Sequence, residues 1–226
     1  MPPPRAVVFD LDGLMFNTEE LYQQVGAELL RRRGHVLTQA LLDQMMGRPS
    51  RVALQIMIDT HQLAATVDEL IAETDALFPE ILRTQLAPMP GLVELLAALE
   101  QRGLPKAIAT SSRRSFVERV LGMFDYQRRF SPILTSEDIV QGKPHPEIYL
   151  RAAARLDLSP SEMLVLEDSE NGCRAAVAAG AVTVAVPGPH SRQHNFSGAV
   201  LVADSLRDPR LYQLLELPPA TGGTAA

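Results

Sequence analysis

The stretch AVVFDLDG, residues 6–13, decides the fold that we predict for this chain. Its first four residues are apolar without polar alternation, which is typical of a strand buried on both faces of a parallel sheet. Asp10 and Asp12 follow directly, and the two-residue period of a strand places both on the same side. Open α/β sheets bind ligands at the carboxyl ends of their strands. The stretch therefore predicts a parallel sheet with an acidic site at the end of its first strand.

Further apolar runs continue this pattern along the chain. They are Ala107–Ala109, Pro132–Leu134, Leu164–Leu166, Val182–Val186 and Val200–Val202. Helical segments separate them: Gly103 and Gly180 stand where helix C-caps belong, and Ser115 with Glu118 predicts a capping box before a helix over Phe116–Met123. The predicted fold class is α/β, with a Rossmann-like parallel-sheet core.

Residues 17–86 interrupt the alternation, because they show apolar stripes at helical spacing and no convincing strand. Thr66 and Glu69 predict a capping box for the last helix of this region, and Pro79 predicts a kink or a split in it. We therefore expect a helical bundle at residues 17–86, inserted into a core domain of residues 1–16 and 87–217. Residues 218–226 are rich in Pro, Ala, Gly and Thr, and we expect them to be a disordered tail.

The composition disfavours several classes of protein. The 21 basic and 27 acidic residues give a net charge of −6, whereas nucleic-acid binders usually present a basic face. The longest apolar stretches are far shorter than the roughly 20 residues of a membrane helix. The single Cys173 cannot form an internal disulfide, and the first residues lack the pattern of a signal peptide. We expect a soluble, cytoplasmic protein with neither a nucleic-acid nor a membrane partner.

Polar groups follow the next strands of the predicted sheet as well. Thr110 and Ser111 end the second strand, where hydroxyl and backbone N–H groups can cradle a phosphate, although both residue types are also common helix caps. Lys143 is fixed between glycine and proline after the third strand, and is either a positioned charge for phosphate or a solvated loop lysine. Glu167 and Asp168 end the fourth strand. An Asp-x-Asp-Gly stretch by itself also occurs in ordinary turns, but the spacing of a calcium loop is not met.

Taken in chain order, these four motifs resemble those of the haloacid dehalogenase superfamily, and most closely its β-phosphoglucomutase-like and phosphoglycolate phosphatase-like subgroup. Residues 10–19 resemble motif I, residues 110–112 motif II, residues 143–144 motif III and residues 167–172 motif IV. The resemblance spans roughly Ala6 to Pro187. It implies that the helical insertion is a cap domain.

The resemblance implies a Mg²⁺-dependent phosphatase that hydrolyses a small phosphorylated metabolite, such as a sugar phosphate or phosphoglycolate, through an aspartyl-phosphate intermediate. In that reaction Asp10 attacks phosphorus, and Asp12 protonates the leaving oxygen and then activates water. The implied Mg²⁺ site consists of the Asp10 carboxylate, the Asp12 backbone carbonyl and Asp168, with Glu167 close to or within the metal shell. Hard oxygen ligands suit that ion.

The remaining site residues are also implied by the resemblance. Lys143 and Thr110 complete the catalytic set, and together with the Ser111 amide they bind the phosphate. Arg51 is a candidate substrate-binding residue of the cap, or else a solvated arginine in the first turn of a helix. Because the cap itself covers the site, we expect a monomer.

Two residues depart from the family pattern. Asn17 stands where a third aspartate is common, and we expect it to affect the geometry of the cap hinge. Tyr22 stands where mutases of the subgroup carry a cap histidine, unless it is a helix-packing residue. This second departure favours hydrolysis over a sugar phosphomutase of the β-phosphoglucomutase type. The other alternative is a non-enzymatic binding protein on the same fold, and the intact motif residues disfavour it. A dehalogenase is also disfavoured, because enzymes of that branch do not normally use the second aspartate or Mg²⁺.

Overall fold

The structure is a computed structural model that describes residues 2–45 and 50–219. The chain divides into two compact units. We call Met1–Phe16 with Pro88–Ala226 the sheet unit, and Asn17–Ala87 the helical unit. Each is described by itself.

Parallel pairing joins all strands of the sheet unit. Within the described residues it has six strands: β1 (Ala6–Phe9), β2 (Lys106–Ala109), β3 (Ile133–Leu134), β4 (Met163–Glu167), β5 (Val182–Ala185) and β6 (Leu201–Val202). Their order is β3-β2-β1-β4-β5-β6, with Val8 of β1 opposite Ala107 of β2 and Val165 of β4. The predicted α/β class with a parallel-sheet core is confirmed. β1 lies in the interior of the sheet, which is why its four residues are all buried and apolar.

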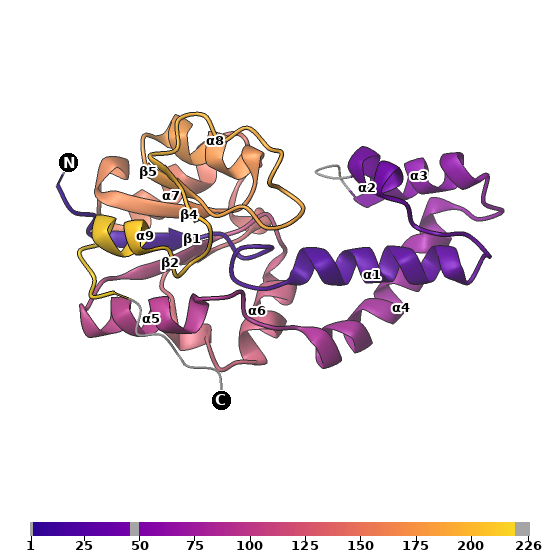
Figure 1. The fold of residues 1–226 in the computed structure, drawn as a ribbon, viewed down its shortest axis with the longest axis horizontal. Coiled ribbons are helices and arrows are strands. Elements are labelled where there is room, and N and C mark those ends of the chain that lie inside the picture. The colour runs from indigo at the N-terminus through magenta and orange to yellow at the C-terminus, as the bar shows by residue number, and fades with distance from the viewer. Residues whose placement is uncertain (1, 46–49, 220–226) are drawn as a thin grey trace. The chain divides into compact units, whose positions relative to one another are not determined.

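Helices cover both faces of this sheet (Figure 1). The helices α5 (Leu92–Gln101) and α6 (Arg114–Gly122) lie on one side, and α7 (Glu147–Leu156) and α8 (Glu170–Ala179) on the other. Small residues of α7 and α8, including Ala152 and Ala176, pack against alanines of the strands, so helix and sheet approach closely. The helix α9 (Pro209–Leu214) and the 3₁₀ turns Gln127–Arg129, Ser136–Asp138 and Pro160–Glu162 complete the unit.

Two helix ends test the capping predictions in this unit. Gly180 ends α8 in the left-handed region at φ 83°, as predicted for a C-cap. The capping box predicted from Ser115 and Glu118 is wrong, because α6 begins at Arg114 and Ser115 lies inside it. The N–H of Arg114 instead donates to the Glu137 carboxylate at 3.4 Å. An acceptor distant in sequence thus replaces the local cap.

The helical unit contains α1 (Thr18–Arg31), α2 (Gln39–Met45), α3 (Ser50–His61) and α4 (Val67–Gln85) within the described residues. The capping box predicted for α4 is confirmed, since the N–H of Glu69 donates to the Thr66 hydroxyl at 3.2 Å and the N–H of Thr66 donates to the Glu69 carboxylate at 2.7 Å. α4 runs continuously through Pro79, so the proline does not split it. No described helix is both long and apolar enough to cross a bilayer.

The two segments that lead into and out of the helical unit meet at Asn17. Its backbone N–H donates to the Ala87 carbonyl at 3.2 Å, and the Ala87 N–H donates to the Asn17 side-chain oxygen at 2.8 Å. The Asn17 side-chain nitrogen donates to the Gln85 carbonyl at 3.2 Å. Asn17 therefore uses both halves of its amide. Of the tail predicted to be disordered, residues 220–226 lie outside the described part of the chain.

Candidate active site

The ends of three neighbouring strands bring polar residues to one edge of the sheet. Asp10 follows β1, Thr110 follows β2, and Glu167 is the last residue of β4, with Asp168 next to it. All four side chains are at least nine-tenths buried, with Asp10 exposed by only 6%. Buried carboxylates are costly unless they are paired, so this concentration of acids requires compensating charge or donors.

Lys143 supplies part of that compensation from the loop before α7. Its Nζ lies 2.5 Å from Asp10 Oδ1 and 2.5 Å from Glu167 Oε1, and it also donates to the Ala109 carbonyl at 3.0 Å. Burial by itself would lower the pKa of Lys143, but the two carboxylates outweigh burial and hold the pKa well above its usual range. Lys143 is therefore a fixed positive charge beside Asp10, and the structure contradicts the alternative of a solvated loop lysine.

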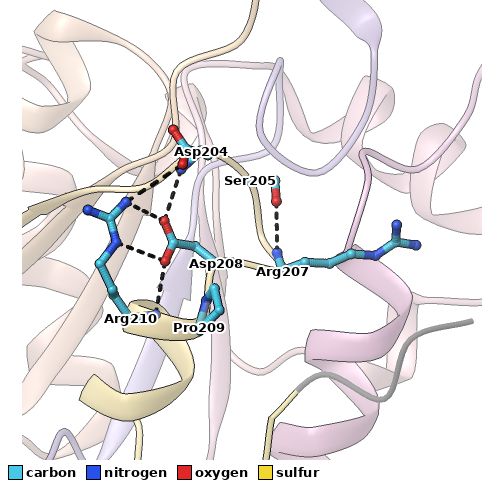
Figure 2. Close-up of a pocket in the computed structure, with 6 residues that line it drawn as sticks. All are labelled: Asp204, Ser205, Arg207, Asp208, Pro209 and Arg210. Carbon is cyan, nitrogen blue, oxygen red and sulfur yellow. Dashed lines mark hydrogen bonds and ion pairs between the residues drawn. The ribbon is translucent and has the colours of Figure 1, made fainter.

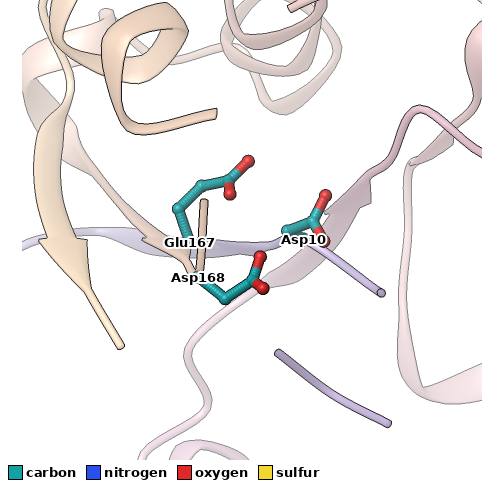
Figure 3. Close-up of side chains that lie close together, drawn as sticks. All are labelled: Asp10, Glu167 and Asp168. Carbon is teal, nitrogen blue, oxygen red and sulfur yellow. The ribbon is translucent and has the colours of Figure 1, made fainter. Parts of the chain in front are cut away.

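Asp10, Glu167 and Asp168 converge on the same space (Figure 3), and one carboxylate oxygen from each lies within 4.8 Å of the others. Burial, and to a smaller extent the neighbouring Glu167, raise the pKa of Asp10 to about 8, against the opposing effect of Lys143. If all three carboxylates are ionised, the single ammonium of Lys143 leaves two negative charges uncompensated, which is why the proton on Asp10 is held so strongly without a cation. A divalent cation with a preference for oxygen ligands, such as Mg²⁺, fits this cluster in charge and in donor type.

Asp12 has different partners from Asp10. The Ser112 hydroxyl donates to Asp12 Oδ2 at 2.6 Å, and the Thr110 hydroxyl approaches the same oxygen at 3.3 Å. The N–H of Ser112 donates to the Thr110 hydroxyl at 3.0 Å, which holds the two hydroxyls together. Two carboxylates in unlike environments are suited to unlike roles. Ser112 was predicted only as part of the second motif and without a role of its own, because a serine before a helix looks like an ordinary cap.

Both oxygens of Glu167 are occupied by donors from its own unit. Oε1 accepts from Lys143 and from the Tyr149 hydroxyl at 2.6 Å, and Oε2 accepts from the Ser169 hydroxyl at 3.0 Å and the Ser169 N–H at 3.3 Å. Burial raises the pKa of Tyr149 well above its usual range, so the phenol stays a donor. Sequence reasoning missed Tyr149, since a tyrosine among apolar helix residues looks like a packing residue.

The geometry and the comparisons with known proteins agree. Residues 7–186 match the family described as haloacid dehalogenase-like hydrolase. This chain is a haloacid dehalogenase-like hydrolase. The resemblance stated from the sequence motifs is thereby confirmed, as is the prediction of an enzyme.

Two relatives and one solved structure illustrate the membership. The bifunctional riboflavin kinase/FMN phosphatase of Arabidopsis thaliana is 32% identical over 94% of this chain, which spans 56% of that relative. The phosphorylated carbohydrates phosphatase of Thermotoga maritima is 32% identical to this chain, and the matched region covers 77% of this chain and 81% of that relative. A HAD family hydrolase from Deinococcus radiodurans, solved with bound phosphate and sodium, is 28% identical with a TM-score of 0.81, covering 96% of this chain and 99% of that one.

Three further residues considered in the sequence analysis are Ser111 of the sheet unit and Arg51 and Tyr22 of the helical unit. Ser111 is exposed beside Thr110. Arg51, near the start of α3, forms an exposed ion pair with Asp68 at 2.7 Å. The ring of Tyr22 stacks on Phe78, with the ring centroids 4.3 Å apart, which favours the packing alternative for that residue. The phosphate-binding role of Ser111 and the substrate-binding role of Arg51 stay predictions.

A separate pocket of about 510 Å³ lies after β6 (Figure 2). Its lining is Asp204, Ser205, Arg207, Asp208, Pro209 and Arg210. Arg210 pairs with Asp208 at 2.6 Å and approaches Asp204 at 3.9 Å, and Arg207 pairs with Glu94 at 2.6 Å. The charges of this pocket are thus matched within the sheet unit, and it contains no residue of the carboxylate cluster. The carboxylate cluster is the candidate active site.

Proposed function

We propose that this hydrolase is a Mg²⁺-dependent phosphatase that acts on a small phosphorylated metabolite, of the sugar phosphate or phosphoglycolate type, through an aspartyl-phosphate on Asp10. The observation that carries the proposal is the Lys143 ammonium held 2.5 Å from the Asp10 carboxylate at the acidic edge of the sheet. The two relatives described above bear the names of phosphatases, one of them for phosphorylated carbohydrates.

The first step joins Asp10 to phosphorus. An Asp10 oxygen attacks, the bond from phosphorus to the substrate oxygen breaks, and Asp12 gives that oxygen its proton. Attack of a carboxylate on a phosphate brings like charges together, and the Lys143 ammonium offsets part of the repulsion. Thr110 and the Ser111 amide would hold the phosphoryl oxygens.

The second step returns Asp10 to its free form. Asp12, now ionised, takes a proton from water, and the water oxygen attacks phosphorus while the bond to Asp10 breaks, releasing phosphate. The hydroxyls of Ser112 and Thr110 orient the Asp12 carboxylate in both steps.

The residues that would hold Mg²⁺ are Asp10 and Asp168 through their carboxylates and Asp12 through its backbone carbonyl, with Glu167 beside them. When bound, the ion would favour the ionised form of Asp10 and offset the charge of the phosphate. The expectations of a monomer in the cytoplasm, and of no nucleic-acid or membrane partner, stay predictions.

A panel of phosphorylated metabolites with free phosphate as the readout tests the proposal. We expect release from a sugar phosphate or a related small phosphate ester with Mg²⁺, loss of activity with a chelator, and recovery when Mg²⁺ is restored. Full activity in excess chelator would refute the metal requirement, and no release from any ester, with or without added metal, would refute the phosphatase.

A sugar phosphomutase is distinguished on β-glucose 1-phosphate by phosphorus NMR. A hydrolase yields free phosphate, whether or not a bisphosphate primer is present. Formation of glucose 6-phosphate with little free phosphate would replace the hydrolase with the mutase.

A further inference from the structure

Tyr149 contributes two contacts to the charged cluster from the buried face of α7. Its hydroxyl donates to Glu167 Oε1 at 2.6 Å, and its ring lies under Lys143, with Nζ 5.2 Å from the ring centroid. The residue has no exposed surface and packs among the alanines between α7 and the strands. A phenylalanine would make the same apolar contacts, so packing does not explain the hydroxyl.

Glu167 is where the hydroxyl acts. This carboxylate is fully buried and accepts four donors, of which only Lys143 is charged. Lys143 is shared between Glu167 and Asp10 at equal distances of 2.5 Å. A neutral donor to Glu167 Oε1 weakens the electrostatic attraction between that oxygen and the shared ammonium. It also fixes the orientation of the carboxylate.

We infer that Tyr149 is a positioning residue of the active site, whose hydroxyl orients Glu167 so that Lys143 is held against Asp10. The inference rests on the proposed function, in which Lys143 offsets the charge developing between Asp10 and phosphate. Without the hydroxyl, Glu167 Oε1 has one donor fewer and draws Lys143 away from Asp10. The chemical step then slows, while substrate binding by other groups is unchanged.

The chain offers a matched control for removing a buried phenol. Tyr212 is 2% exposed, and its hydroxyl has no hydrogen-bond partner among the described residues. Tyr149→Phe and Tyr212→Phe each delete one buried hydroxyl from the sheet unit, and only the first removes a donor to Glu167. Both variants are first compared by circular dichroism and melting temperature, so that all assays are made on folded protein.

Hydrolysis of p-nitrophenyl phosphate by the full chain with Mg²⁺ is the first readout. For Tyr149→Phe we expect kcat to fall about tenfold with KM within about twofold of wild type. Tyr212→Phe should match wild type in both constants. An unchanged kcat, or a loss confined to KM, would overturn the inference.

Nitrogen-15 NMR of the lysine ammonium groups is the second readout, and it needs neither activity nor metal. The chain has two lysines, Lys106 and Lys143, so the Lys106→Arg variant assigns the signals. We expect the Lys143 ammonium to be protected from exchange in wild type and in Tyr212→Phe, and to exchange faster in Tyr149→Phe. An unchanged Lys143 signal in Tyr149→Phe would overturn the inference. If wild type hydrolyses no phosphate ester the proposed function fails, while this signal still decides whether Tyr149 positions Lys143.

Discussion

Asp208 is a buried carboxylate away from the active site, at the start of α9 (Figure 2). Arg210 donates to it through two side-chain nitrogens, at 2.6 Å and 3.0 Å, and through its backbone N–H at 2.9 Å. These hydrogen bonds lower the pKa of Asp208 to about 2, against the effect of burial. The ionised form therefore stabilises the fold, in full above the unfolded pKa of about 4 and less as pH falls toward 2.

We predict that Asp208→Asn lowers the free energy of unfolding by about 2 kcal/mol at pH 7, and that this difference narrows to about half at pH 3. Urea denaturation at the two pH values measures it. Asp204→Asn is the control, because the Asp204 side chain is fully exposed and should matter little. A loss for Asp208→Asn that does not change with pH would contradict the assignment.

Gly172 of α8 lies against the side chain of Glu167. The Cβ atom of any other residue at this position would overlap the Glu167 carboxylate. A free glutamate could move aside at little cost, but Glu167 is held by Lys143, Tyr149 and Ser169. We predict that Gly172→Ala lowers the free energy of unfolding by about 1–3 kcal/mol and removes most of the phosphatase activity.

Gly26 in α1 is the matched control for that substitution, because a Cβ there would lie 3.5 Å from Met57 Cε, which is an ordinary contact. Gly26→Ala should be neutral or stabilising by up to about 1 kcal/mol. Urea denaturation and phosphate release measure both variants. Gly172→Ala with wild-type stability and activity would show that Glu167 is free to move.

At the scale of elements, Asn17 joins the segment before α1 to the segment after α4. Its side chain accepts from the Ala87 N–H and donates to the Gln85 carbonyl. An aspartate can accept but cannot donate when ionised, so it would face the Gln85 carbonyl with a negative charge. We predict that Asn17→Asp speeds hydrogen exchange at Ala87 at neutral pH. Equal exchange at Ala87 in the variant and wild type would show that the amide does not tie these segments together.

Strands were predictable in this chain because buried parallel strands are continuous apolar runs, as at 6–9 and 182–185. The cap of α4 was predictable as well, because Thr66 and Glu69 are close in sequence. The start of α6 was not, since its acceptor is Glu137, which lies 23 residues away in the chain. Local signals identify elements when the partners are local, and fail when a distant side chain replaces them.

At the scale of the whole molecule, two compact units are joined by the chain at residues 16–17 and 87–88. We predict that they close when the phosphate site is filled, because closure would exclude water during attack by Asp10. Small-angle scattering with Mg²⁺ and a trifluoroberyllate phosphate mimic should show a smaller radius of gyration than scattering without them. Asp10→Asn is the control, since it removes the carboxylate to which the mimic binds. Identical curves for wild type would count against closure.

The candidate site was predictable in part at this scale. Parallel strands bring their carboxyl ends to one edge, so the sequence alone placed Asp10, Glu167 and Asp168 near one another. The sequence could not show that the Ser112 hydroxyl donates a hydrogen bond to Asp12 or that the Tyr149 hydroxyl donates one to Glu167, because those contacts depend on how a loop and a helix pack. Their roles, like those of the motif residues, are testable chemically.

The aspartyl-phosphate on Asp10 is the central claim, and trapping it is the most direct test. Wild type and Asp12→Asn are mixed with Mg²⁺ and a substrate found by the metabolite panel, quenched with acid, and reduced with borohydride, which converts an aspartyl-phosphate to homoserine. We predict homoserine at position 10 of wild type by peptide mass spectrometry. With p-nitrophenyl phosphate, whose leaving group departs without a proton, Asp12→Asn should contain more homoserine than wild type, because water is activated poorly. Omission of substrate should abolish it. An unmodified Asp10 under turnover conditions in both proteins, or homoserine at another position, would contradict the account.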